Sequence, residues 1–169
     1  SINVISIHTA QDVCEEGNAE TLAELFGMSD VSIFANSVDN FGAGRKGTIN
    51  KISPADFKNN VENKLNTKII RTNECFNEIK EIQNIAVLPG SGTQFIDEII
   101  DSVDVFITGD ISHRYLLKAD DAKLGLIQVG HISTEIPGMK KFVEKLEKEV
   151  DLKLSYIYRK YYEWAVFIK

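Results

Sequence analysis

Short apolar runs alternate with amphipathic segments along the chain, and this alternation predicts strands that alternate with helices. The apolar, β-branched runs bounded by turn residues predict strands. They cover residues 2–7, 31–35, 48–52, 68–71, 85–88, 103–108 and 124–129, with a C-terminal hairpin formed by residues 152–158 and 164–168. The glycine- and asparagine-rich stretch 36–47 is expected to be a loop that leads into the third strand.

Helix starts and stops are marked by capping residues. Asn18 is expected to cap a helix that ends at Gly27, and Ser53 to cap one with Pro54 in its first position. In the second helix, apolar residues at four-residue steps predict one buried stripe, made of Phe57, Val61 and Leu65. Further helices are expected around residues 95–100, 115–119 and 139–150.

This order of elements predicts an α/β fold in which helices flank a mainly parallel or mixed sheet. The 169 residues are expected to form one compact unit. A change in composition around residues 72–82 marks a possible seam within it.

Composition narrows the class of function. Nineteen basic and 25 acidic residues give a net charge of −6, which argues against a general binder of the nucleic-acid backbone. Cys14 and Cys75 stand 61 positions apart without zinc-finger spacing, so a reducing, cytoplasmic compartment is expected. No apolar run is long enough for a membrane span, and no signal peptide is visible, although the chain opens with Ser1 rather than Met.

Candidate chemistry lies in the histidines, because all three stand beside carboxylates at the expected strand ends. The pairs are His8 with Asp12, Asp110 with His113, and His131 with Glu135. The carboxyl ends of strands in an α/β sheet are where ligands collect. Imidazole nitrogen and carboxylate oxygen are ligands that Zn, Fe and Mn accept, so the three pairs together predict a polar metal pocket at one edge of the sheet.

Each pair taken alone also has a local structural interpretation. Glu135 suits a helix N-terminus, Asp12 an Asx-type turn, and Asp110 a helix cap. Two glycine-rich motifs, GAGRKG at residues 42–47 and PGSG at 89–92, are either anion cradles or tight turns. The aromatic residues near the C-terminus suit hairpin packing or a subunit contact.

The ordered motifs HTAQD, GAGRKG, AVLPGSG, VDVFITGDISH and GHISTE resemble those of the GTP cyclohydrolase 1 type 2 homologs, also called the NIF-three-like family. The resemblance runs from residue 5 to about residue 146. It implies a two-lobed α/β protein, of which this chain is the C-terminal part. It also implies a toroidal homohexamer with two divalent metal ions per subunit.

Carried over residue by residue, the resemblance makes Asp12, His131 and Glu135 metal ligands. His8, Asp110 and His113 are expected to line the pocket around them. The tandem histidine motif of the family lies upstream of HTxxD and is not found in this sequence. Three ligands of a five-ligand site would remain, so this chain alone is expected to bind metal weakly or not at all.

Two functions remain open at this point. One is a dinuclear metal-dependent hydrolase acting on a nucleotide or another phosphate-containing small molecule, in which Glu135 or His113 moves a proton. The other is a ring-forming interaction or regulatory protein without enzymatic activity. Neither metal identity nor substrate follows from the residues.

Overall fold

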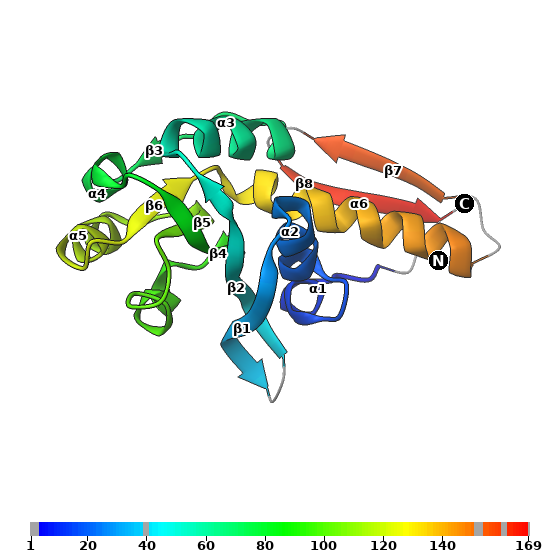
Figure 1. The fold of residues 1–169 in the computed structure, drawn as a ribbon. Coiled ribbons are helices and arrows are strands. Elements are labelled where there is room, and N and C mark those ends of the chain that lie inside the picture. The colour runs from blue at the N-terminus through cyan, green and yellow to red at the C-terminus, as the bar shows by residue number, and fades with distance from the viewer. Residues whose placement is uncertain (1–3, 39–40, 151–153, 160–161, 169) are drawn as a thin grey trace.

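Six strands form one mixed sheet with the order β1-β2-β4-β5-β6-β3 (Figure 1). The structure, a computed structural model, describes residues 4–38, 41–150, 154–159 and 162–168. Neighbours β4–β5 and β5–β6 are parallel, and the other pairs of the sheet are antiparallel. The strands are β1 (Ser29–Val38), β2 (Phe41–Ile52), β3 (Arg71–Thr72), β4 (Ile82–Ser91), β5 (Val105–Asp110) and β6 (Gly125–Gln128).

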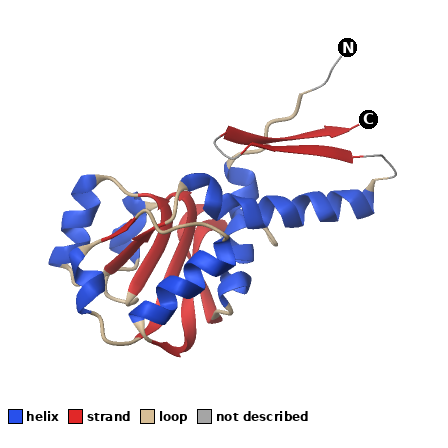
Figure 2. Cartoon of the chain, turned by 90° about the horizontal axis from the view of Figure 1, so that it is seen from above, coloured by secondary structure: helices blue, strands red, loops and turns tan. Residues whose placement is uncertain are grey.

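Helices cover both faces of this sheet. They are α1 (Thr9–Val13), α2 (Asn18–Phe26), α3 (Pro54–Leu65), α4 (Glu74–Glu78), the 3-10 helix η1 (Thr93–Glu98), α5 (His113–Asp121) and α6 (His131–Glu149). The antiparallel hairpin of β7 (Leu154–Arg159) and β8 (Tyr162–Ile168) follows. Figure 2 shows α6 running outward from the sheet with this hairpin alongside. In the described part of the chain no helix is long and apolar enough to cross a membrane.

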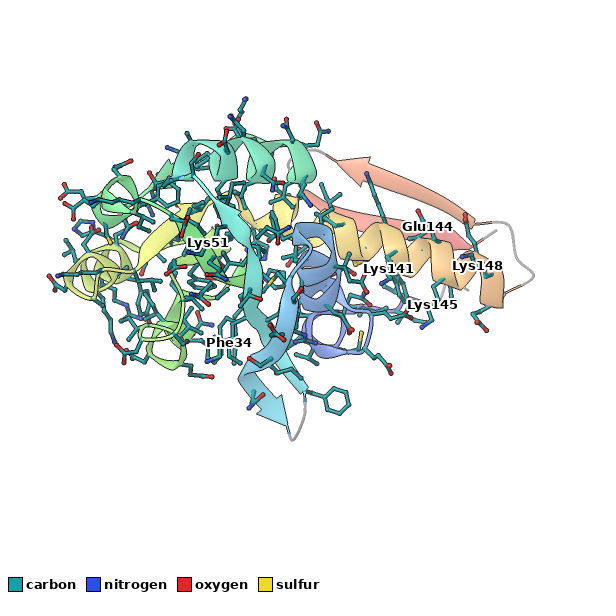
Figure 3. All side chains as sticks on the ribbon, in the orientation of Figure 1. Phe34, Lys51, Lys141, Glu144, Lys145 and Lys148 are labelled. Carbon is teal, nitrogen blue, oxygen red and sulfur yellow. The ribbon has the colours of Figure 1, made fainter. Side chains whose placement is uncertain are left out.

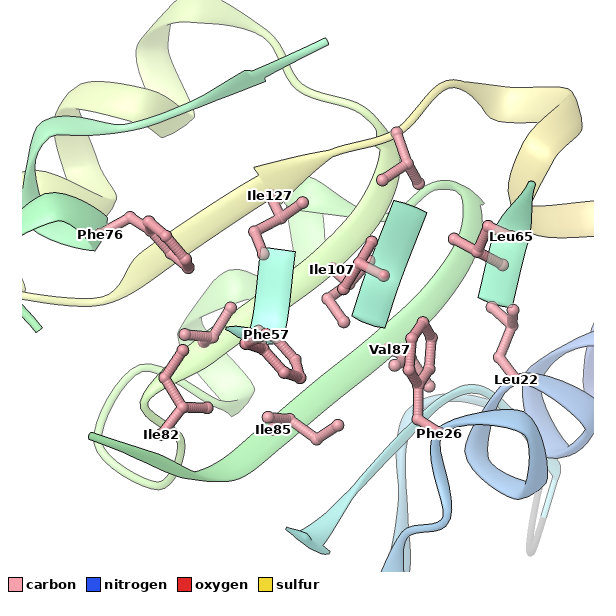
Figure 4. Packing of buried hydrophobic residues seen from close by; sticks show 13 residues of the cluster. Leu22, Phe26, Phe57, Leu65, Phe76, Ile82, Ile85, Val87, Ile107 and Ile127 are labelled. Atoms are coloured by element: carbon pink, nitrogen blue, oxygen red, sulfur yellow. The ribbon is translucent and has the colours of Figure 1, made fainter. Parts of the chain in front are cut away.

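The core divides into two layers because successive strand residues point to opposite faces. On β4, Ile85 and Val87 face the layer under α2, α3 and α4, whereas Ala86 and Leu88 face the layer under η1 and α5. Figure 4 shows the first layer, where Phe57 lies over the central strands. The central strands are buried on both faces, which explains why they read as continuous apolar runs.

The mixed α/β architecture and the C-terminal hairpin were predicted correctly. So was the start of α3, where the Ser53 hydroxyl oxygen accepts a hydrogen bond from the Asp56 backbone N–H at 3.2 Å. The stripe of Phe57, Val61 and Leu65 is buried as expected. The side chains of the C-terminal aromatic residues lie outside the described residues.

Three local expectations were wrong. Residues 4–8 form no strand, and Val4 and Ile5 are 87% and 85% exposed, because no described strand lies beside them; residues 1–3 lie outside the described residues. Of the expected loop 36–47, residues 36–38 belong to β1 and residues 41–47 to β2, since strand pairing overrides the low strand propensity of glycine and asparagine. The cap of α2 is Gly17, so Asn18 is the first helical residue.

Helix α6 is also tied to the N-terminal helices. Lys141 and Lys145, labelled in Figure 3, form ion pairs with Glu24 at 2.7 Å and Glu16 at 2.5 Å. These pairs lie on the surface, where ion pairs stabilise little. The packing of α2 against α6 therefore contributes more to holding residues 9–26 in place.

The cap of α3 gives the first prediction. Ser53→Ala removes the acceptor for the Asp56 N–H and should lower the free energy of unfolding by about 1 kcal/mol. Urea denaturation followed by circular dichroism measures this difference. The matched control is Ser91→Ala, because the exposed Ser91 has no side-chain hydrogen bond among the described residues. Equal stabilities for the two variants would contradict the capping role.

Candidate functional site

The carboxyl ends of β4, β5 and β6 meet at one edge of the sheet because the three strands are parallel. Pairing continues past β6, with the Gly130 N–H donating to the Gly109 carbonyl at 3.1 Å. Helix α6 begins at the next residue, His131. This register sets His131 beside Asp110, although the two residues stand 21 positions apart.

The imidazole of His131 lies between two carboxylates. Its Nδ1 is 2.5 Å from Oδ2 of Asp110, and its Nε2 is 3.1 Å from Oε1 of Glu135. Glu135 stands one helical turn after His131, so the helix itself holds this second pair together. The His131 side chain is 47% exposed, so the group is open to solvent on one side.

Glycines allow the helix to approach the strands this closely. A Cβ on Gly109 would lie 2.5 Å from the Gly90 carbonyl oxygen and 2.6 Å from the Cα of His131. A Cβ on Gly90 would lie 3.0 Å from Nε2 of His131 and 3.2 Å from Oε1 of Glu135. The PGSG turn therefore does lie beside the candidate site.

Thr134 fixes the backbone at the same place. Its Oγ1 accepts a hydrogen bond from the Gly90 N–H at 2.8 Å and donates to the His131 carbonyl at 2.6 Å. The Gly90 N–H is thus already used and is not free to bind an anion. This favours the tight-turn interpretation of the motif over an anion cradle at that residue.

Asp12 reaches this group from α1, far away in sequence. Its Oδ1 accepts a hydrogen bond at 2.8 Å from Nδ2 of Asn18, the first residue of α2. Asp12 interacts electrostatically with His131 and with Glu135, and His8 interacts with both carboxylates. The structure therefore places Asp12 within electrostatic range of His131 and Glu135 at the strand ends.

Burial and neighbouring charges shift the ionisation of these groups. Burial raises the pKa of Glu135 and of Asp12 above their ordinary values, against the lowering effect of nearby His131. Burial alone would lower the pKa of His131. The hydrogen bond to Asp110 and the charges of Glu135 and Asp110 outweigh burial, so the pKa of His131 lies above its ordinary value.

His113 is placed differently. It is exposed at the first position of α5, and within the described residues none of the interactions of His131 or Glu135 involves it. Asp110, which had a helix cap as its alternative role, instead contacts His131. The cap of α5 is Ser112, without a side-chain hydrogen bond to the helix.

Sequence reasoning missed two polar contributors to the site. Asn18 had been interpreted as a helix cap, whereas its side chain donates to Asp12. Thr134 was not singled out, although it lies within the GHISTE motif between His131 and Glu135. For Asn18, the available signal was the presence of an asparagine shortly after the HTAQD motif.

The donor chemistry of the group fits a divalent metal ion. The 3.1 Å between His131 Nε2 and Glu135 Oε1 is close to the separation of about 3.4 Å between two ligands that each lie about 2.1 Å from a tetrahedral zinc ion. A carboxylate on the second imidazole nitrogen, here Asp110, is common behind metal-binding histidines. Within the described residues, however, no three His, Cys, Asp or Glu side chains are already grouped as ligands, so Asp12 does not complete a closed site here.

The sequence matches the Duf34/NIF3 (NGG1p interacting factor 3) family over residues 1–161. The chain belongs to this family. It is 31% identical over 158 residues to a GTP cyclohydrolase 1 type 2 homolog of Methanocaldococcus jannaschii, covering 90% of this chain and 61% of that protein. It is also 31% identical over 151 residues to a homolog of the same name from Nostoc, covering 86% and 56%.

Solved structures of the same kind share the fold. Reduced HcgD from Methanocaldococcus jannaschii superposes with a TM-score of 0.73 at 28% identity, covering 86% of this chain and 56% of that one. The hypothetical protein SA1388 of Staphylococcus aureus gives a TM-score of 0.72 at 24% identity, covering 89% and 64%, which shows the fold alone. The chain thus spans a little over half of the length of the proteins it matches.

The ionisation of His131 gives the second prediction. Its raised pKa means that the contact with Asp110 stabilises the fold at pH values below the ordinary imidazole pKa of about 6.5. This contribution is lost as the pH rises through the higher pKa of the folded protein. Asp110→Asn should therefore lower the pKa of His131, and should destabilise the protein more at about pH 5.5 than at about pH 8.5.

Imidazole Hε1 titration by NMR measures the pKa, and urea denaturation at the two pH values measures stability. Asp97→Asn is the matched control, because Asp97 pairs with Lys118 on the surface. An unchanged His131 titration in Asp110→Asn would contradict the contact.

Proposed function

We propose that Asp12, His131 and Glu135 bind a divalent metal ion, and that the protein is a metal-dependent hydrolase of a nucleotide or another phosphate-containing substrate. The observation that carries this proposal is the placement of His131 between Asp110 and Glu135, with Asp12 beside them. The chain supplies this group from three separate segments, which are α1, the end of β5 and the start of α6. A local turn or a helix cap would not require residues from three segments.

The charges of the group favour a cation. Asp12, Asp110 and Glu135 bring up to three negative charges together, and one protonated imidazole offsets one of them. Burial raises the pKa of Asp12 and Glu135, which reflects the unfavourable free energy of keeping both ionised in this place. A divalent ion would offset the remaining charge and favour the ionised form of both carboxylates.

Each residue has a definite part in this proposal. Asp110 fixes the imidazole ring of His131 so that Nε2 faces Glu135. His131 and Glu135 are the adjacent donor pair, and Asp12 would supply a further carboxylate from α1. The ion, when bound, would supply Lewis acidity and a water of lowered pKa.

Proton transfer is assigned to Glu135 or His113. Burial raises the pKa of Glu135, which brings that carboxyl closer to the range useful for acid–base chemistry near neutral pH. His113 stands three positions after Asp110, exposed at the start of α5. The names of the relatives, GTP cyclohydrolase 1 type 2 homologs, support a nucleotide as substrate.

Metal binding is the third prediction. We expect the 169-residue chain to bind Mn²⁺ weakly, and Asp12→Ala or His131→Ala to reduce its affinity about tenfold or more. Paramagnetic broadening of ¹⁵N-labelled protein during a Mn²⁺ titration measures binding, and should affect Gly90, Gly109 and Gly130 first. Asp30→Ala is the matched control, since Asp30 is an exposed carboxylate on β1. Broadening that is unchanged in Asp12→Ala would contradict the proposed ligands.

Turnover is the fourth prediction. A screen of nucleotides and phosphoesters with Mn²⁺, Zn²⁺ or Fe²⁺ should find a substrate whose hydrolysis depends on the metal and is lost in Asp12→Ala. His113→Ala should lower the rate and change its pH profile without changing Mn²⁺ affinity if His113 carries the proton. Turnover that survives both a chelator and Asp12→Ala would exclude the proposed mechanism.

A second candidate function is a ring-forming interaction protein without catalysis. It is favoured by the way α6 and the β7–β8 hairpin project from the sheet (Figure 2), because a two-stranded hairpin has little core of its own. The family description, NGG1p interacting factor 3, names an interaction rather than a reaction. Analytical ultracentrifugation tests the expected homohexamer, and a hexamer that turns over no substrate in the screen would favour this function.

A further inference from the structure

Asn18 is buried at the first position of α2 and does not cap that helix. The cap is Gly17, and the Asn18 side chain is turned toward α1 instead. There its Nδ2 donates to Oδ1 of Asp12 at 2.8 Å, and the side chain is 3% exposed. Among the described residues no other hydrogen bond reaches the Asp12 carboxylate, so its second oxygen is left for another partner.

The other end of the same amide contacts α6. A Cβ on Gly138 would lie 2.2 Å from Oδ1 of Asn18 and 2.6 Å from its Cα. The absence of a side chain at this position therefore lets the start of α2 lie directly against the backbone of α6. Because α6 also carries His131 and Glu135, Asn18 connects Asp12 to the helix that holds the other two proposed ligands.

The orientation of the amide follows from its neighbours. A carboxylate only accepts hydrogen bonds, so the NH₂ group of Asn18 must face Asp12. Oδ1 then points toward α6, where it is buried and has no hydrogen-bond partner within the described residues. A residue serving packing alone would not need this arrangement, since an apolar side chain of the same shape would leave no polar atom without a partner.

We propose that Asn18 is a positioning residue for Asp12, holding one carboxylate oxygen so that the other is presented to the metal ion. This inference rests on the proposed function, because it assigns Asp12 the part of a metal ligand. Hydrogen-bonded partners of metal ligands commonly change metal affinity tenfold to a hundredfold when they are removed.

The test compares metal affinity with stability in Asn18→Leu. Leucine has the branched shape of asparagine but no donor, so it keeps the packing against Gly138 and removes the hydrogen bond to Asp12. We expect the apparent dissociation constant for Mn²⁺ to rise about tenfold. The melting temperature should be unchanged or higher, because the buried Oδ1 without a partner is also removed.

The matched control is Asn84→Ala. Asn84 donates to Asp104 at 3.4 Å near the start of β4, the opposite end of that strand from Gly90. This variant loses a comparable amide–carboxylate contact. Because Asn84 is distant from the proposed ligands, Mn²⁺ affinity should stay within about twofold of the wild type. A merely structural role of Asn18 would instead lower the melting temperature and leave the affinity of the folded protein unchanged, which would overturn the inference.

Asp12→Ala, measured in parallel, separates the two proposals. If Asp12→Ala loses affinity and Asn18→Leu does not, the positioning role is wrong and the ligand assignment stands. If Asp12→Ala binds Mn²⁺ as tightly as the wild type does, the proposed function fails and this inference fails with it. The same holds if the wild-type chain itself does not bind Mn²⁺.

A second measurement needs no variant at Asn18 and applies if Asn18→Leu does not fold. The side-chain NH₂ resonances of Asn18 in the wild-type chain should shift on addition of diamagnetic Zn²⁺, while those of Asn84 should not. Unshifted Asn18 resonances in a chain whose His131 resonances do respond to Zn²⁺ would overturn the inference.

Discussion

The close approach of α6 to the ends of β4 and β5 is the constraint on which the rest of the site depends. It exists because Gly109 has no side chain, so that the first residue of the helix lies against the strand backbone. The parallel register of β5 and β6, continued by the Gly130 hydrogen bond, then determines which residue of β5 faces His131. That residue is Asp110, and without this register Asp110 would end its strand without contacting His131.

Asp12 depends on a different set of contacts. Residues 4–8 precede α1 without regular structure, so the place of Asp12 is determined by the packing of α1 on β2 and α2. Helix α2 in turn packs on the sheet through Leu22 and Phe26 and on α6 through Asn18. The burial of those side chains stabilises the arrangement far more than the surface ion pairs of Lys141 and Lys145 do. The two halves of the site therefore meet through hydrophobic packing rather than through their own charges.

The parts of the fold that sequence predicted well are those determined by neighbours in the chain. The capping residues before α3 and the stripe of Phe57, Val61 and Leu65 need only helix geometry. The sequence also placed Glu135 at a helix start, but α6 begins already at His131, and their spacing of four on this helix then explains their contact. The strand expected at residues 2–7 failed in its described part, because a strand exists only where a pairing partner is present, and β propensity cannot supply one.

The site itself was predictable only in outline. Two of the three histidine–carboxylate pairs, His8 with Asp12 and His131 with Glu135, lie together in the candidate site. Spacing could not show that Asp110 contacts His131 rather than His113. That pairing depends on strand order, which is a property of the whole sheet. Asn18 shows the same limit, since local rules favour a helix cap and tertiary packing turns its amide toward Asp12.

In helix α6, tertiary contacts near the candidate site override the local helix propensity of the sequence. Pro137 and Gly138 stand inside it, although proline and glycine are less favourable than alanine in a helix interior by about 3 and 1 kcal/mol. The turn before them is held to the strand ends by Thr134 and the close contact at Gly109, and Gly138 is where α2 approaches. Alanine at position 138 has the higher helix propensity but would displace Asn18, and with it the carboxylate that Asn18 holds.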